Sequence, residues 1–146
     1  MIGPELFDAV KALIAPAVPA SITVHDTDAS HVSADGANYP FIVLSGGVPR
    51  EYGVAAGWCR DEAETLIRVT HTALSPDAVR KLLRQTRGVL VDARPAIDGW
   101  HGFELAVEDS SGVDVDRDVK ILSGVAPKHP FYAVDIYRVR ATRRKE

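Results

Sequence analysis

The chain has 146 residues, of which 46% are hydrophobic and 25% charged, and its formal net charge is −3. These values suit one ordinary globular domain, and the weak negative charge argues against bulk binding of nucleic acid or of an anionic membrane. The single cysteine excludes an internal disulfide, and no apolar run is long enough to predict a membrane span. We therefore expect one soluble domain over residues 1–146, made and kept in a cytoplasm.

The N-terminal part of the sequence predicts one helix and two strands. Pro4 suits a first helical turn, and a helix is expected from there to Pro16. Its apolar face would consist of Leu6, Val10, Leu13, Ile14 and Ala17. Residues 21–25 predict a short strand, residues 26–39 a polar loop, and the apolar run 40–44 a central strand.

The middle of the chain predicts a strand followed by the best-marked helix. Residues 65–72 alternate, with Ile67 and Val69 on one side of the strand and polar residues on the other. Ser75 then supplies an oxygen for the free amides of a helix start, and Pro76 fits the first helical position. This helix should cover the sheet with a stripe made of Val79, Leu82, Leu83, Thr86 and Leu90.

The following segment predicts one more strand and a loop. Residues 100–108 alternate, which would place Phe103, Leu105 and Val107 together on one face. Residues 109–128 are polar and predict a loop with weak strand character.

The C-terminal part predicts the longest strand, over residues 131–140, and a frayed basic tail over residues 141–146. Strands and helices do not alternate strictly, which argues against a doubly wound parallel sheet. We therefore predict an α+β fold: a mixed or antiparallel sheet of about five strands, with two helices packed on one face.

The histidines are the first candidates for chemistry. None of the five forms a pair at metal-ligand spacing on a helix. His71 falls on the apolar side of its strand, where a hydrogen-bonded core residue is the simplest interpretation. The alternative is a small hydrolase that uses His71 with Cys59 or an aspartate.

An acidic triplet resembles the opening of a calcium-binding loop. It consists of Asp114, Asp116 and Asp118, but Val119 and Val125 occupy the positions that would require glycine and glutamate. A solvated acidic loop, or a docking surface for a basic partner, fits better. We expect no metal and no cofactor.

Basic residues gather in two places. The first is the predicted helix, with Arg80, Lys81, Arg84 and Arg87, of which the three arginines form one stripe. The second is the C-terminus, with Arg138, Arg140, Arg143, Arg144 and Lys145. The chain is acidic over residues 26–35 and 108–118. These surfaces are either solvated faces or a self-complementary charge pattern suited to ring assembly.

The order of patterns is similar to a known family. The matching features are the N-terminal amphipathic helix, the apolar strand at 40–44, the strand–helix unit at 66–83 and the closing strand at 131–139. In these features the chain resembles the tail terminator (tail completion) proteins of long-tailed bacteriophages.

The resemblance implies a structural virion protein without catalytic activity. Such proteins form a six-membered ring on the tail tube, end its polymerisation, and offer a docking surface to the neck or connector. The implied partners are further copies of the chain, the tail tube protein and the neck protein. Genome DNA would pass through the ring without sequence-specific recognition, and no membrane is involved. The implied location is the neck end of the tail in the virion, and the host cytoplasm during assembly.

Two loops are the expected contacts, 45–62 and 109–128. The first is glycine-rich and predicts a loop or the turn of a long hairpin. The full set of candidate interface residues is Tyr52, Trp58, Arg80, Arg84, Arg87, Asp114, Asp116, Asp118, Arg138 and Arg140. The alternatives to a tail terminator are another head–tail joining protein of the neck, the histidine-dependent hydrolase, and a host-encoded dimeric binding module with a ligand near Trp58.

Overall fold

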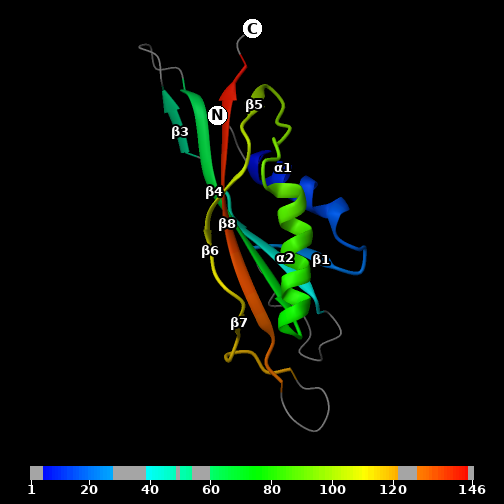
Figure 1. The fold of residues 1–146 in the computed structure, drawn as a ribbon. Helices are drawn as coiled ribbons and strands as arrows, with labels where there is room; N and C mark the ends of the chain where they lie inside the picture. The colour runs from blue at the N-terminus through cyan, green and yellow to red at the C-terminus, as the bar shows by residue number, and fades with distance from the viewer. Residues whose placement is uncertain (1–4, 28–38, 49, 54–59, 122–127, 145–146) are drawn as a thin grey trace.

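The computed structural model describes residues 5–27, 39–48, 50–53, 60–121 and 128–144. It has the predicted α+β class, and Figure 1 shows the arrangement of its elements. In chain order these are α1 (Glu5–Ile14), a short 3-10 turn (Ala15–Ala17), β1 (Thr23–Asp26), β2 (Phe41–Gly46), β3 (Arg50–Gly53), β4 (Arg60–Ala73), α2 (Pro76–Leu90), β5 (Trp100–Gly102), β6 (Ala106–Ser110), β7 (Asp114–Val115) and β8 (Phe131–Arg143).

One long antiparallel pair, β4 with β8, forms the centre of the sheet. It runs without a break from the Glu62–Thr142 pair to the Ala73–Phe131 pair. Strands β2 and β3 pair with the other edge of β4, and β1 continues the sheet parallel to β2. Strands β5, β6 and β7 follow one another along the outer edge of β8. The described residues therefore form a mixed sheet of eight strands, more than the five expected.

Both helices lie on the same side of this sheet, as predicted (Figure 1). The core fills the space between them and alternate residues of the two central strands. Its fully buried members from the sheet include Ile67, Val69, Tyr137 and Val139. The intervening residues of β4 and β8 face away from the helices, and Leu66 among them is 48% exposed.

Helix α2 matches its prediction closely. It begins at Pro76, and the Ser75 side chain accepts a hydrogen bond of 3.2 Å from the Ala78 amide. The buried residues are the five of the predicted stripe: Val79, Leu82, Leu83, Thr86 and Leu90. Local signals determine this helix, because both the cap and the stripe lie within its own sequence.

The segment after α2 differs from its prediction. In place of the expected strand at 100–108 there are two strands, β5 and β6. In the short segment between them, the Leu105 amide donates a hydrogen bond to the Ala93 carbonyl. Leu105 is buried, but Phe103 and Val107 are 41% and 40% exposed, so the expected shared apolar face is wrong. The physical reason is the edge position of this segment, where a register irregularity follows Val107.

The C-terminal prediction also needs correction. Strand β8 continues to Arg143, and Ala141 is fully buried in a register pair with Ala63. The expected frayed tail at 141–146 is therefore ordered over its first three residues by pairing with β4 and β5. Strand β4, with 14 residues against 13, is longer than β8.

The backbone at Gly46, the last residue of β2, should not tolerate a side chain, and Gly88 in α2 is the matched control. Gly46 has φ +85°, and a Cβ there would lie 2.7 Å from the Leu66 carbonyl oxygen, whereas a Cβ on Gly88 in α2 would meet nothing within 4 Å. We predict that Gly46→Ala lowers the free energy of unfolding by roughly 2 kcal/mol or more. The matched control Gly88→Ala should raise it by about 0.5–1 kcal/mol. Urea denaturation of both variants checks this, and equal effects would contradict the structure.

Candidate functional site

A buried polar network lies between α2 and the sheet. Its two sheet residues, His71 on β4 and Asp135 on β8, are both fully buried. Two neighbouring residues of α2, Thr86 and Arg87, are their partners. We call these four residues together with Ser110 the α2–sheet network.

Asp135 is held by an arginine and a serine. The Arg87 Nε and Nη2 atoms each donate to one carboxylate oxygen at 2.7 Å, which is the bidentate geometry of a strong ion pair. The Ser110 hydroxyl donates to the same carboxylate at 2.6 Å and accepts from Arg87 at 2.7 Å. Burial works to raise the pKa of Asp135, but the hydrogen bonds from Arg87 and Ser110 outweigh it and lower the pKa below its usual value.

Both ring nitrogens of His71 have hydrogen-bond partners in the α2–sheet network or on β8. Its Nδ1 lies 3.3 Å from the Ala133 carbonyl oxygen and its Nε2 lies 2.7 Å from the Thr86 hydroxyl. Because a carbonyl can only accept, we assign the proton of the neutral ring to Nδ1. The Thr86 hydroxyl then donates to Nε2 at 2.7 Å in preference to the Leu83 carbonyl oxygen, which lies 3.2 Å from it. Burial lowers the pKa of His71 to about 4 and so keeps the ring neutral near pH 7.

These contacts make the network structural. The His71 ring is 0% exposed and cannot reach a substrate, so its interpretation as a core histidine is confirmed. The Asp135 carboxylate is occupied by Arg87 and Ser110 and has no geometry for proton transfer to a bound molecule. Cys59, the other residue of the hydrolase alternative, lies outside the described residues.

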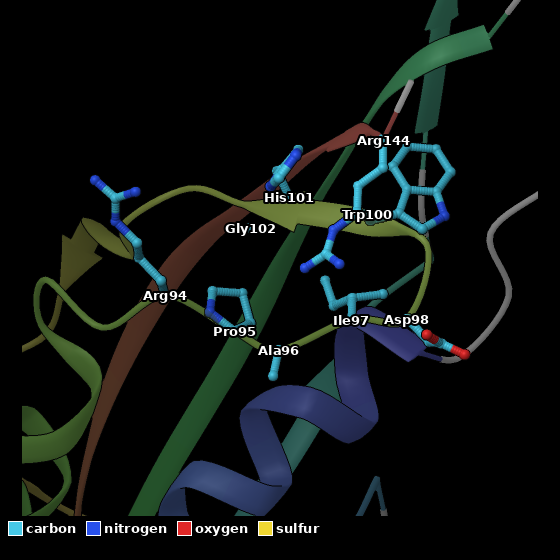
Figure 2. Close-up of a pocket in the computed structure, with 9 residues that line it drawn as sticks. All are labelled: Arg94, Pro95, Ala96, Ile97, Asp98, Trp100, His101, Gly102 and Arg144. Carbon is cyan, nitrogen blue, oxygen red and sulfur yellow. The ribbon is translucent and has the colours of Figure 1, made fainter. Parts of the chain in front are cut away.

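The described part of the chain also has surface hollows. One of about 460 Å³ lies beside β5, and Figure 2 shows the nine residues that line it. The Arg144 side chain points into this hollow, whereas the charged groups of Arg94 and Asp98 lie on opposite sides of it and do not converge with Arg144 (Figure 2). One guanidinium that points into the hollow, without a second charged group converging on it, does not form a catalytic constellation.

A second hollow of about 620 Å³ lies where the chain crosses from β5 to β6. Three large apolar side chains, Val91, Phe103 and Val107, are each about 40% exposed there. The Arg140 guanidinium lies 5.2 Å from the centre of the Phe103 ring. Exposed apolar clusters of this kind are typical of protein contacts more than of catalysis.

The three arginines of the predicted basic stripe on α2 lie in two different environments. Arg80 pairs with Asp77 at 2.8 Å on the surface, and Arg84 is exposed with no ion partner in the described part of the chain. Arg87 belongs instead to the α2–sheet network, so its side chain is engaged within the chain. Sequence spacing put these three arginines together, but the structure brings only two of them to the outer side of α2.

The other candidate residues are dispersed. Arg138 is held between Glu64 at 3.6 Å and Glu108 at 2.8 Å, and Arg140 stacks on Phe103 as described. The three carboxylates of the acidic triplet, Asp114, Asp116 and Asp118, lie on or just after β7. Tyr52 lies in β3, in register with Glu62 on β4, so a hairpin forms within the expected loop 45–62. Trp58 lies outside the described residues.

Asp135 and Ser110 are the residues that sequence reasoning missed. A signal for Asp135 was available: it occupies the same parity on β8 as the buried residues Ala133 and Tyr137. A charged residue at an inward position of a central strand requires a partner. Nothing in the sequence identifies Ser110, because its role depends on the pairing of β6 with β8.

Comparison with protein-family models and with curated proteins finds no match to this chain. Among the residues that the structure describes, no group of three or more histidine, cysteine or acidic side chains is placed to hold a metal ion. None of the helices described is long and apolar enough to cross a membrane.

The ion pair predicts a specific loss of stability. Arg87→Ala would leave the Asp135 carboxylate buried without its cation, and we expect a loss of roughly 2–3 kcal/mol. The value lies at the lower end for broken ion pairs because the Arg87 side chain is 42% exposed and water can partly replace it. Arg84→Ala, one turn earlier and exposed, should change stability by less than about 0.5 kcal/mol. Thermal or urea unfolding measures both, and similar losses in the two variants would contradict the network.

The buried histidine predicts a pH dependence of stability. The unfolded state binds a proton on His71 near pH 6.5, whereas the folded state binds it only near pH 4. The free energy of unfolding should therefore fall as the pH decreases from about 6.5 to about 4, by up to ~3 kcal/mol.

The variant His71→Gln separates this effect from that of Asp135. The pKa of Asp135 is lowered in the folded state, so its contribution is lost only below the ordinary aspartate range, near pH 3.8. We expect the variant to lose the dependence between pH 6.5 and 4 and to keep the fall at lower pH. Urea titrations at several pH values measure this, and an unchanged slope above pH 4 would refute the assignment to His71.

Proposed function

We propose that this chain is a structural protein of a long-tailed bacteriophage, a tail terminator. In this proposal it forms a ring on the tail tube, ends tube polymerisation and provides the docking surface for the neck. Its partners are further copies of itself, the tail tube protein and the neck or connector protein. It would act at the neck end of the tail in the virion, after assembly in the host cytoplasm, with genome DNA passing through the ring.

One observation carries most of the proposal. The sequence segments that resemble the family, β4 with α2 and the closing strand β8, are also the centre of the fold. They pair along the whole length of the sheet and are joined by the Arg87–Asp135 ion pair. The resemblance therefore concerns one connected structural unit, which gives it more weight than the same matches scattered over the chain would have.

The surface of the molecule supports an assembly role. Both helices cover one side of the sheet (Figure 1), and on the other side Leu66 and Arg68 of β4 are exposed among the residues that the structure describes. Large apolar side chains such as Leu66 and Phe103 are exposed at separate places on the described surface. A protein that acts through several contacts with unlike neighbours needs several such surfaces.

Of the three other candidate functions, the hydrolase is less well supported by the structure. Another head–tail joining protein of the neck would share this fold and would differ in which neighbours it contacts. The histidine-dependent hydrolase has no support from the geometry at His71, whose ring is inaccessible. For the binding module, the ligand was expected near Trp58, which lies outside the described residues.

The proposal predicts rings. Native mass spectrometry of the purified chain should show a closed oligomer, and six copies of the 15.8 kDa chain would have a mass of about 95 kDa. When the chain is mixed with a tail tube protein from the same phage, negative-stain images should show rings at one end of tubes of limited length. The control is the tube protein alone. A chain that stays monomeric and leaves tube length unchanged would refute the proposal.

A further inference from the structure

The outer side of α2 carries a basic strip. Lys81 and Arg84 are exposed there and have no ion partner in the described part of the chain. Arg80 lies beside them, with its side chain 62% exposed and its only described partner, Asp77, itself almost fully exposed. Just before the helix, Leu74 is 47% exposed. We call Arg80, Lys81 and Arg84 the basic strip.

An acidic strip follows β6 and β7. Its carboxylates bond to backbone amides of their own segment: Asp109 to Ser110 at 2.9 Å, Asp114 to Val115 at 2.7 Å and Asp116 to Asp118 at 3.2 Å. None of them forms an ion pair within the residues that the structure describes. Arg117 and Lys120 are interspersed, so the segment keeps an excess of negative charge. Val119, next to the last carboxylate, is 36% exposed. The acidic strip is defined as Asp109, Asp114, Asp116 and Asp118.

The basic strip and the two strand carboxylates of the acidic strip, Asp109 on β6 and Asp114 on β7, lie on different sides of the sheet. Asp114 is in register with Tyr132 on β8, and residues paired in this way project from the same face. Tyr132 precedes Ala133, which is fully buried on the helix side, so Tyr132 and Asp114 face away from the helices. Helix α2 covers the opposite face (Figure 1). One copy therefore cannot bring its own strips together, but two copies can.

We propose that the basic strip of one copy docks on the acidic strip of the next, so that copies of the chain join head to tail. Each strip has unpaired charge of opposite sign to the other, and each has an exposed apolar residue at its end, Leu74 or Val119, as an interface core requires. Two unlike surfaces on one chain generate a heterologous contact, which closes into a ring when the rotation permits. This inference rests on the proposed function and names the contact that would build the ring.

The test is a charge exchange in the full chain. We compare the wild type with Lys81→Glu/Arg84→Glu, with Asp114→Lys/Asp118→Lys, and with the chain that carries all four substitutions. Self-association is measured by analytical ultracentrifugation and native mass spectrometry, and circular dichroism checks that each variant is folded. We expect each double variant to associate at least roughly tenfold more weakly than the wild type, and the quadruple variant to recover.

A matched control reverses two carboxylates elsewhere. Asp8 and Asp98 are exposed and lie outside both strips, so Asp8→Lys/Asp98→Lys changes the net charge as much as the acidic-strip variant does. It should associate like the wild type. A loss of association in this control equal to that in the strip variants would mean that net charge alone is responsible, and would overturn the inference.

The remaining outcomes separate this inference from the proposed function. Rings that persist in both double variants overturn the strip contact and leave the tail terminator proposal standing. Double variants that dissociate without recovery in the quadruple variant overturn direct pairing of the two strips. A wild-type chain that never associates overturns both proposals.

Discussion

The bidentate ion pair between Arg87 and Asp135 is the interaction on which the arrangement of α2 depends. A carboxylate buried in the middle of β8 would cost several kcal/mol without a partner, so the helix must place a cation at this position. The neighbouring residue, Thr86, bonds to His71 on β4. Two adjacent residues of one helix thus contact the two central strands, and this fixes both the rotation of α2 and its position along the sheet.

Fixing the inner side of α2 also determines its outer side. With Thr86 held against the sheet, the helical repeat directs Arg80, Lys81 and Arg84 towards solvent. The side chains of the α2–sheet network satisfy one another and are engaged within the chain. The α2–sheet network therefore determines which side of α2 is exposed. The charged side chains that are available for contact with other molecules are those on the outside of the domain.

The sequence was sufficient where the signals are local. The β4–α2 unit was predicted with its buried residues because alternation, the Ser75 cap and the helical stripe all lie within the unit itself. The short strands between residues 100 and 115 could not be predicted in this way, because their pairing with β8 defines them. Phe103 shows the limit: the sequence alternation placed it on one face with Leu105, but it lies between β5 and β6 and is 41% exposed, whereas Leu105 is buried. The role of Arg87 could not be predicted either, because its partner Asp135 lies 48 residues away in the sequence.

Folding and assembly are separable in this molecule, and this bears on what the chain can do. The polar side chains of His71, Thr86, Arg87 and Asp135 find their partners within the chain, so this part of the interior does not need a neighbour to satisfy it. The unpaired charges and exposed apolar side chains lie at its periphery, where changes have little effect on the free energy of unfolding. A domain of this kind can fold as a monomer and then assemble through its surface. The tail terminator proposal fits this separation, because it assigns the function of the chain to contacts made by its surface.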